Sequence, residues 1–112
     1  MLNISNCRFN TSYSCVSYEA LNEDNPSLCE EFKIIFDREA CYVNLARTYY
    51  GGKNFCGNIK NDIDWYNECI SLRAQNTGSI KLCDTINEKA PHYDTWYNKE
   101  KCLELVKMYS NK

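Results

Sequence analysis

The sequence predicts an all-α protein, built as an array of short helical hairpins that disulfides join. Three observations support this fold class. Cys29, Cys56 and Cys83 follow one another at intervals of 27 residues, a period within the range typical of helical repeats. Helix-capping residues precede several of the apolar segments. Four glycines and two prolines are few for an all-β protein, which needs many tight turns.

The three cysteines lie in copies of one phrase, bulky–Cys–x–x–bulky. The copies are Leu28–Phe32, Phe55–Ile59 and Leu82–Ile86. The cysteine and its two bulky neighbours share one face of a helix, so each copy predicts a short helix with an apolar inner side. The core residues expected on this basis are Leu28, Phe32, Leu45, Ile59, Leu72, Ile86 and Leu105.

A chain of 112 residues fits a single domain spanning 1–112. Residues 1–11 show little periodicity and are expected to form a less regular N-terminal segment that carries Cys7. The rest of the chain is expected to fold as helical hairpins. Their expected ranges are about 12–50, 54–76 and 80–110.

The first hairpin range begins with a helix from about Ser12 to Leu21. Asn25-Pro26 predicts the next helix start, because Asn caps and Pro at the first helical position loses no hydrogen bond. Asp37 is expected to begin a further helix that ends near Tyr49, and Gly51-Gly52 to stop it. The inward side chains expected after Pro26 are Leu28, Cys29, Phe32 and Ile35 or Phe36.

The second hairpin is expected to contain a short helix over Phe55–Lys60 and a longer one over Ile63–Asn76. Asp62 is the predicted cap of the longer helix. Gly78 is the predicted stop, since glycine adopts the left-handed conformation that ends helices.

The third hairpin is expected to begin at Ser79, which is positioned to cap a helix from Ile80 to about Lys89. Pro91 ends that helix because proline cannot continue it. Asp94 is predicted to cap the last helix, which runs from Thr95 to about Ser110.

The eight cysteines are expected to form disulfides rather than a zinc site. No CxxC occurs, and His92 is the single histidine, whereas zinc sites take cysteines in close pairs and often recruit histidine. Disulfides indicate an oxidising compartment or the interior of a hyperthermophile. No targeting segment is visible, because Met1–Asn6 lacks an apolar stretch. Either a signal peptide has been removed, or the chain reaches its compartment without one.

Two pairing schemes place the midpoints between cysteines in or near turns. The within-hairpin scheme joins Cys7–Cys15, Cys29–Cys41, Cys56–Cys69 and Cys83–Cys102. The rival scheme joins Cys15–Cys29, Cys41–Cys56 and Cys69–Cys83, and leaves Cys7 and Cys102 to join the two ends. A stacked array separates its ends, and distant Cα atoms cannot be bridged, so the within-hairpin scheme is favoured and the rival stays open.

With one cysteine on each helix of a hairpin, the chain resembles Sel1-like and tetratricopeptide-type solenoids in plan, over about residues 12–110. Its period of 27 is shorter than theirs, and their glycine and alanine signature positions are missing. A second comparison is the twin-CX9C hairpin of the mitochondrial intermembrane space, from which the spacings here differ. Both resemblances imply a module that contacts other proteins.

No residue set forms a recognisable active site, so we expect neither an enzyme nor a cofactor. The motifs GxGxxG, P-loop, HExxH and GxSxG are absent. His92 is expected to be an exposed loop residue. The carboxylate pairs Glu23-Asp24 and Glu30-Glu31 are expected to be solvated rather than catalytic.

Aromatic side chains are the unusual surface candidates. In Tyr49-Tyr50, Trp65-Tyr66 and Trp96-Tyr97, both members cannot face one core. Helical geometry predicts that Trp65 points inward and Trp96 outward. The alternatives are that aromatics fill gaps between hairpins and that Trp96 folds back over its own loop. The candidate partner contacts are Trp96, Tyr97 and Tyr50. The candidate glycosylation sites are Asn3 and Asn10, which begin sequons.

The net charge of −2 gives no reason to expect a nucleic acid. No apolar run is long enough for a membrane span. We therefore expect a non-catalytic interaction or structural module, with a protein partner or self-assembly and no metal. The alternative is a small secreted effector or inhibitor that binds one target. The expected location is extracellular, on a virion or cell surface, or inside a hyperthermophile, with the mitochondrial intermembrane space as alternative.

Overall fold

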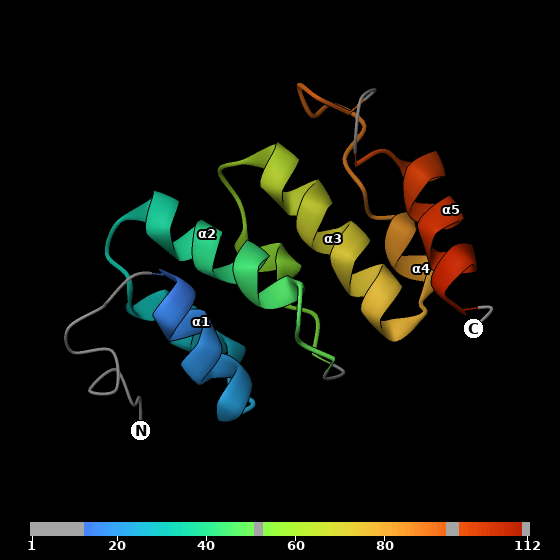
Figure 1. Cartoon of the computed structure of the whole chain (residues 1–112). Helices are drawn as coiled ribbons and strands as arrows, with labels where there is room; N and C mark the ends of the chain where they lie inside the picture. The colour runs from blue at the N-terminus through green and yellow to red at the C-terminus, as the bar shows by residue number, and fades with distance from the viewer. Residues whose placement is uncertain (1–12, 51–52, 94–96, 111–112) are drawn as a thin grey trace.

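The computed structural model describes residues 13–50, 53–93 and 97–110. Within these ranges it is helical and contains no strand. The long helices are α1 (Tyr13–Asn22), α2 (Ile35–Ala46), α3 (Ile63–Thr77) and α5 (Lys99–Ser110). The short ones are the 3-10 helices η2 (Pro26–Glu31) and η3 (Cys56–Asn58) and the single turn α4 (Ile80–Cys83). The prediction of an all-α fold is confirmed (Figure 1).

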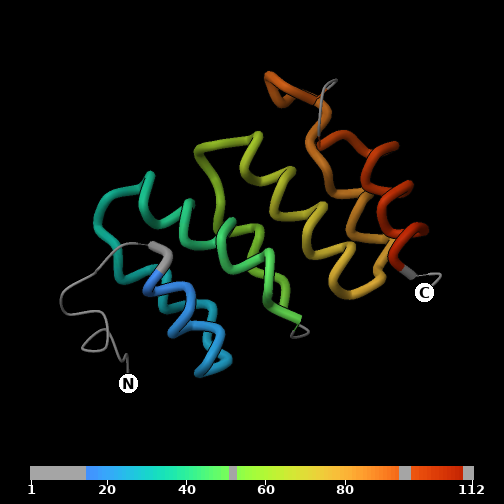
Figure 2. Tube along the Cα trace, viewed as in Figure 1, coloured from blue at the N-terminus to red at the C-terminus, as the bar shows by residue number. Residues whose placement is uncertain are grey.

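The helices follow one another across the molecule in chain order, from α1 at one end to α5 at the other (Figure 2). Helix α2 packs against α1, η2, η3 and α3, and α3 packs against α2, η3, α4 and α5. Among the described elements, α1 and α5 do not contact each other. The two central long helices therefore connect everything else.

Each of three disulfides joins a short helix to the long helix that follows it. They are Cys29–Cys41, Cys56–Cys69 and Cys83–Cys102, with Cα–Cα distances of 5.6, 5.6 and 5.7 Å. All six cysteines are fully buried. These are within-hairpin pairs, and they exclude the rival scheme. Cys15 is disulfide-bonded as well, and Cys7, its predicted partner, lies outside the described residues.

The first predicted helix boundary that proves wrong is the one after Pro26. The segment forms only η2 and ends at Glu31, and Phe32 has extended backbone with ψ 133. The Nε and Nη2 groups of Arg38 both donate to the Phe32 carbonyl at 3.1 Å, which holds the chain out of the helix. Ile35 and Phe36 consequently belong to α2, where they are exposed rather than inward.

Helix α2 begins before the predicted cap. The N-cap position of α2 is Ile34, so Asp37 lies in the first turn and does not cap the helix. The negative charge of Asp37 there still interacts favourably with the helix dipole. The helix ends at Ala46 rather than near Tyr49. The predicted stop at Gly51-Gly52 lies outside the described residues.

The predictions for α3 are confirmed at both ends. The Asp62 side chain accepts a hydrogen bond from the Trp65 N–H at 3.0 Å, which is the geometry of an N-cap. Gly78 follows the helix with φ 70, in the left-handed conformation. The helix expected over Phe55–Lys60 is much shorter, since only η3 forms.

The segment predicted to form the third hairpin differs most from its prediction, because α4 ends at Cys83 instead of near Lys89. Asn67, which is buried on α3, donates to the Asn87 carbonyl at 2.9 Å and accepts from the Asn87 N–H at 2.7 Å. These two hydrogen bonds occupy the N–H and C=O groups of Asn87, which a continued helix would have used in its own hydrogen bonds.

Helix α5 begins at Lys99, later than the predicted Thr95. The Asn98 side chain accepts from the Lys101 N–H at 2.7 Å and so occupies the capping role. Asp94, the predicted cap, lies outside the described residues, as does Trp96. Ser79 occupies the N-cap position of α4 but forms no capping hydrogen bond with its side chain.

The core agrees with most of the predicted positions. Leu28, Leu45, Ile59 and Ile86 are buried. Phe32, Leu72 and Leu105 are only partly buried. Trp65 is likewise partly buried and packs against the core, so its predicted inward orientation is correct only in part.

Two buried charged side chains fix the connections between the helices. Glu39 on α2 accepts four hydrogen bonds of 3.0 Å from the turn that leads into α3. Its donors are the backbone N–H groups of Lys60, Asn61 and Asp62 and the side-chain amide of Asn61. Because Glu39 is only 3% exposed, this carboxylate places the start of α3 against α2.

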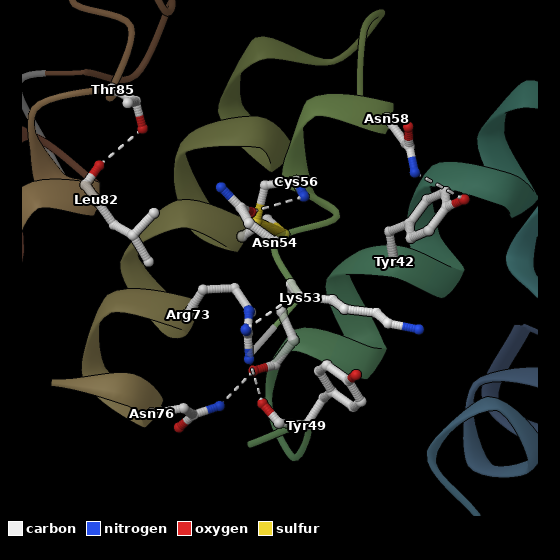
Figure 3. Close-up of a disulfide and its surroundings, with 12 residues drawn as sticks. Tyr42, Tyr49, Lys53, Asn54, Cys56, Asn58, Arg73, Asn76, Leu82 and Thr85 are labelled. Atoms are coloured by element: carbon white, nitrogen blue, oxygen red, sulfur yellow. Dashed lines mark hydrogen bonds between the residues drawn. A yellow bond between two sulfur atoms is a disulfide. The ribbon is translucent and has the colours of Figure 1, made fainter. Parts of the chain in front are cut away.

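Arg73 on α3 performs the same task for the connection after α2. It donates to the carbonyls of Tyr49 at 2.6 Å and Lys53 at 2.8 Å (Figure 3). Its guanidinium lies 5.1 and 5.3 Å from the ring centres of Tyr49 and Phe55. Burial lowers the pKa of the Arg73 guanidinium from its ordinary value. Arg73 therefore joins the loop, the core aromatics and α3.

The left-handed cap at Gly78 provides a local test of the fold. We expect Gly78→Ala to lower the free energy of unfolding by about 1 kcal/mol, because side chains are strained at positive φ. An added Cβ there meets no heavy atom within 4 Å, so the cost is conformational only. Gly57→Ala is the matched control, since its Cβ also has open space and its φ is not positive. Urea unfolding of the oxidised proteins should show a loss for Gly78→Ala only; equal effects would refute the assignment.

Candidate functional site

The long helices form one side of the molecule, and four hollows lie along it. The hollow between α1 and α2 has a volume of about 310 Å³, and a small one between α2 and α3 about 90 Å³. The other two, beside α3 and α5, measure about 360 and 300 Å³. Arg47 lines three of the four and Trp65 lines two. Because the hollows share these residues, they form one continuous surface.

We call this surface the Arg47 face. Its members are Tyr18, Leu21, Asn44, Arg47, Tyr50, Trp65, Glu68, Leu72, Gln75, Tyr97 and Tyr109. Helical spacing explains why they gather. On α3 the contributing positions follow at intervals of three and four residues, which places them on one side of the helix. Cys69 follows Trp65 by four residues and is fully buried, so it lies at the inner edge of this stripe.

An ion pair lies near the centre of the Arg47 face. Arg47, the C-cap residue of α2, has its Nη2 3.4 Å from Glu68 Oε2 on α3, with side-chain exposures of 58% and 15%. Burial, and then the Glu68 carboxylate, raise the pKa of Tyr97, while Arg47 lowers it. The three groups are therefore close enough to influence one another. Such a partly exposed pair contributes at most about 1 kcal/mol, so its value lies in the charge it presents.

His92 is exposed, as expected, but it has a defined partner. Its Nδ1 lies 2.9 Å from Asp64 Oδ2, and its backbone N–H donates to Asp64 Oδ1 at 3.0 Å. These contacts attach the loop before α5 to the first turn of α3. No nucleophile accompanies the histidine among the residues lining this hollow. His92 therefore lines this hollow as an exposed side chain attached to α3.

The carboxylate pairs from the sequence are not brought together into a site. Glu23 is partly buried and the other three are exposed. Two of them accept hydrogen bonds from buried tyrosines: Glu30 from Tyr42 at 2.5 Å and Asp24 from Tyr49 at 2.7 Å. Burial and the Glu30 contact raise the pKa of Tyr42. In the part of the chain that the structure covers, no group of three His, Cys, Asp or Glu side chains is placed to hold a metal.

The structure places two of the predicted contact residues on the Arg47 face. Tyr50 is 70% exposed and lines the same hollow as Tyr109. Tyr97 is partly buried and lines the hollow that contains Glu68. Trp96, Asn3 and Asn10 lie outside the described residues.

Sequence reasoning missed Tyr18, Arg47 and Glu68. The available signal was the spacing of Trp65, Glu68 and Leu72 along α3, which marks one side of the helix. This spacing identifies the α3 part of the surface only. The contact between Arg47 and Glu68 depends on how α2 packs against α3, and no local pattern shows it.

No family model, curated protein or solved structure matches this chain. Within residues 13–50, 53–93 and 97–110, no helix is both long and apolar enough to cross a bilayer. The function must therefore be inferred from the surface itself.

Proposed function

We propose that this protein is a non-catalytic interaction module whose Arg47 face binds another protein. The observation that carries the proposal is the continuity of this face across α1, α2, α3 and α5, with aromatic side chains spread along it. Tyr18, Tyr50 and Tyr109 are 61%, 70% and 47% exposed. Tyrosine, tryptophan and arginine are the residues that contribute most to protein interfaces.

We further propose that the scaffold is an array of hairpin repeats of the kind the sequence suggests. The support is that η2, η3 and α4 each carry a cysteine bonded to the next long helix, at sequence separations of 12, 13 and 19. In solenoids of stacked helix pairs, consecutive helices line an extended binding surface. The Arg47 face has the position of such a surface.

The proposed setting is an oxidising one, such as the extracellular space or the surface of a virion or cell. Three buried disulfides fit this setting. Each closes a loop whose entropy contribution is on the order of 3 kcal/mol. A chain of short helices with a small core depends on such contributions.

Self-association is the second candidate. The observation that favours it is a run of exposed apolar side chains at the start of α2, Ile34, Ile35 and Phe36, which are 64%, 48% and 60% exposed. The Phe36 ring lies 5.0 Å from the Trp65 ring, so this run continues the Arg47 face. A concentration-dependent mass in sedimentation equilibrium, abolished by Ile35→Lys, would favour this candidate.

Selection from a displayed peptide library tests the proposal. We expect oxidised protein to enrich specific peptides. We expect Tyr18→Ala, Trp65→Ala or Tyr109→Ala, which sample the whole face, to weaken each selected peptide by at least about tenfold, equivalent to 1.4 kcal/mol. Ile80→Ala is the matched control, because Ile80 is 50% exposed on α4, away from the face. The proposal would be contradicted if no peptide is enriched. It would also be contradicted if only Ile80→Ala weakens the binding of the selected peptides.

A further inference from the structure

We propose that the hollow between α3 and the start of α5 binds an organic cation, of the kind carried by a lysine side chain. This inference rests on the proposed function and names the chemistry that one part of the Arg47 face would recognise. The hollow has a volume of about 360 Å³ and is lined by Asp64, Trp65, Asn67, Glu68, His92 and Tyr97. That volume is at the lower end of the range for small-ligand sites.

Two aromatic rings line this hollow: that of Trp65 on α3 and that of Tyr97, which lies two residues before the start of α5. Trp65 is partly buried and held by the Phe36 ring, whose centre is 5.0 Å away. Tyr97 is also partly buried. An ammonium or guanidinium group is attracted to the face of such rings, most strongly to tryptophan. The walls therefore suit a cation with an aliphatic stem.

The Glu68 carboxylate supplies the complementary charge. Its side chain is only 15% exposed, and Oε2 has a single long contact of 3.4 Å with Arg47. Within the described ranges, Oε1 has no hydrogen-bond donor. Oε1 is not among the buried side-chain atoms that lack a partner, so it reaches the solvent in the hollow, where a charged donor can bond to it.

The remaining charges oppose other ligands. Asp64 uses both oxygens on His92, so it orients the rim and adds negative charge without taking the ligand. An anion entering the hollow would meet the carboxylates of Asp64 and Glu68. A neutral ligand would leave Glu68 Oε1 unpaired, which is unfavourable once water is displaced. Arg47 contacts the other oxygen of Glu68 and does not line this hollow.

The experiment is a titration followed by NMR, using N-acetyl-Gly-Lys-Gly amide, its uncharged analogue with norleucine in place of lysine, and butylammonium; acetylation removes the N-terminal charge that both peptides would otherwise carry. We expect the oxidised protein to bind the lysine peptide with a Kd of about 1–10 mM, typical of one small group. We expect the norleucine peptide to bind at least about tenfold more weakly. If butylammonium binds with the same affinity as the lysine peptide, a free amine is a sufficient ligand. If butylammonium binds clearly more weakly, the ligand is a lysine side chain within a peptide.

The variant Glu68→Gln retains the shape of the side chain and removes its charge. We expect it to weaken the lysine peptide by at least about tenfold. Glu104→Gln is the matched control on α5, since Glu104 is exposed and outside the hollow. Unchanged binding by Glu68→Gln, or equal binding of the norleucine peptide, would overturn the cation site. Neither result would affect the peptide selection on which the proposed function depends.

Should Glu68→Gln fail to fold, the unmodified protein decides the question. The lysine peptide is expected to shift the indole N–H resonance of Trp65 and the ring resonances of Tyr97. If neither the Trp65 nor the Tyr97 resonances shift on addition of the lysine peptide, the proposal is overturned.

Discussion

Replacing Glu39 with alanine is expected to lower the free energy of unfolding by about 3 kcal/mol, since each orphaned buried donor costs about 1–3 kcal/mol and part of the turn can reach water. Glu39 is 3% exposed and accepts from the N–H groups of Lys60, Asn61 and Asp62. Removing the carboxylate leaves these donors without their acceptor and frees the turn that starts α3.

Urea unfolding of oxidised protein measures this loss. Glu104→Ala is the control, because Glu104 is exposed on α5 and surface substitutions usually change stability by less than about 0.5 kcal/mol. A Glu39→Ala variant as stable as this control would show that the turn does not depend on the carboxylate.

Replacing Arg73 with methionine is expected to cost about 2–4 kcal/mol, although buried ion pairs can sometimes be replaced by apolar residues without loss. The difference here is that Arg73 donates to two main-chain carbonyls, those of Tyr49 and Lys53. Methionine fills much of the volume but orphans both acceptors and removes the cation from the Tyr49 and Phe55 rings.

Arg73→Lys separates the contributions. A lysine retains the charge but lacks the planar fork that reaches two carbonyls at once, so we expect an intermediate loss. Arg47→Met is the control for removing a more exposed arginine, and we expect it to change stability by less than about 1 kcal/mol. Thermal unfolding followed by circular dichroism orders the variants. If Arg73→Met unfolds at the same temperature as Arg47→Met, the hydrogen bonds from Arg73 are not what holds the loop.

The features predicted correctly from sequence are those that local chemistry determines. Asp62 and Gly78 act within one turn of α3, and the within-hairpin disulfides join cysteines that are neighbours along the chain. The two caps depend on residues within one turn, and the bridges join each cysteine to the next one along the chain, at separations of 12, 13 and 19.

The boundaries that were wrong depend on side chains that bond the backbone where a helix would otherwise continue. Helix α4 stops early because Asn67, 20 residues before Asn87, holds the Asn87 backbone. The segment after η2 leaves the helix because Arg38 reaches back to the Phe32 carbonyl. Local propensity cannot reveal such competition, because tertiary hydrogen bonds override it.

The candidate site was predictable only in its aromatic character. Adjacent aromatic pairs made Tyr50 and Tyr97 candidate contacts, together with Trp96, and both tyrosines line the Arg47 face. Arg47 and Glu68 are 21 residues apart in sequence and meet because α2 packs against α3. Their pairing, and hence the charge of the surface, needed the three-dimensional structure.

The central claim is that the Arg47 face, rather than the side that carries the short helices, is the binding surface. Chemical-shift mapping of one selected peptide on isotopically labelled, oxidised protein tests it most directly. The claim predicts shifted amides along the exposed stripes of α1, α2 and α3, including Tyr18, Arg47 and Glu68. Shifts concentrated instead around the hollow on the other side, which Lys60, Tyr66 and Thr85 line, would contradict it.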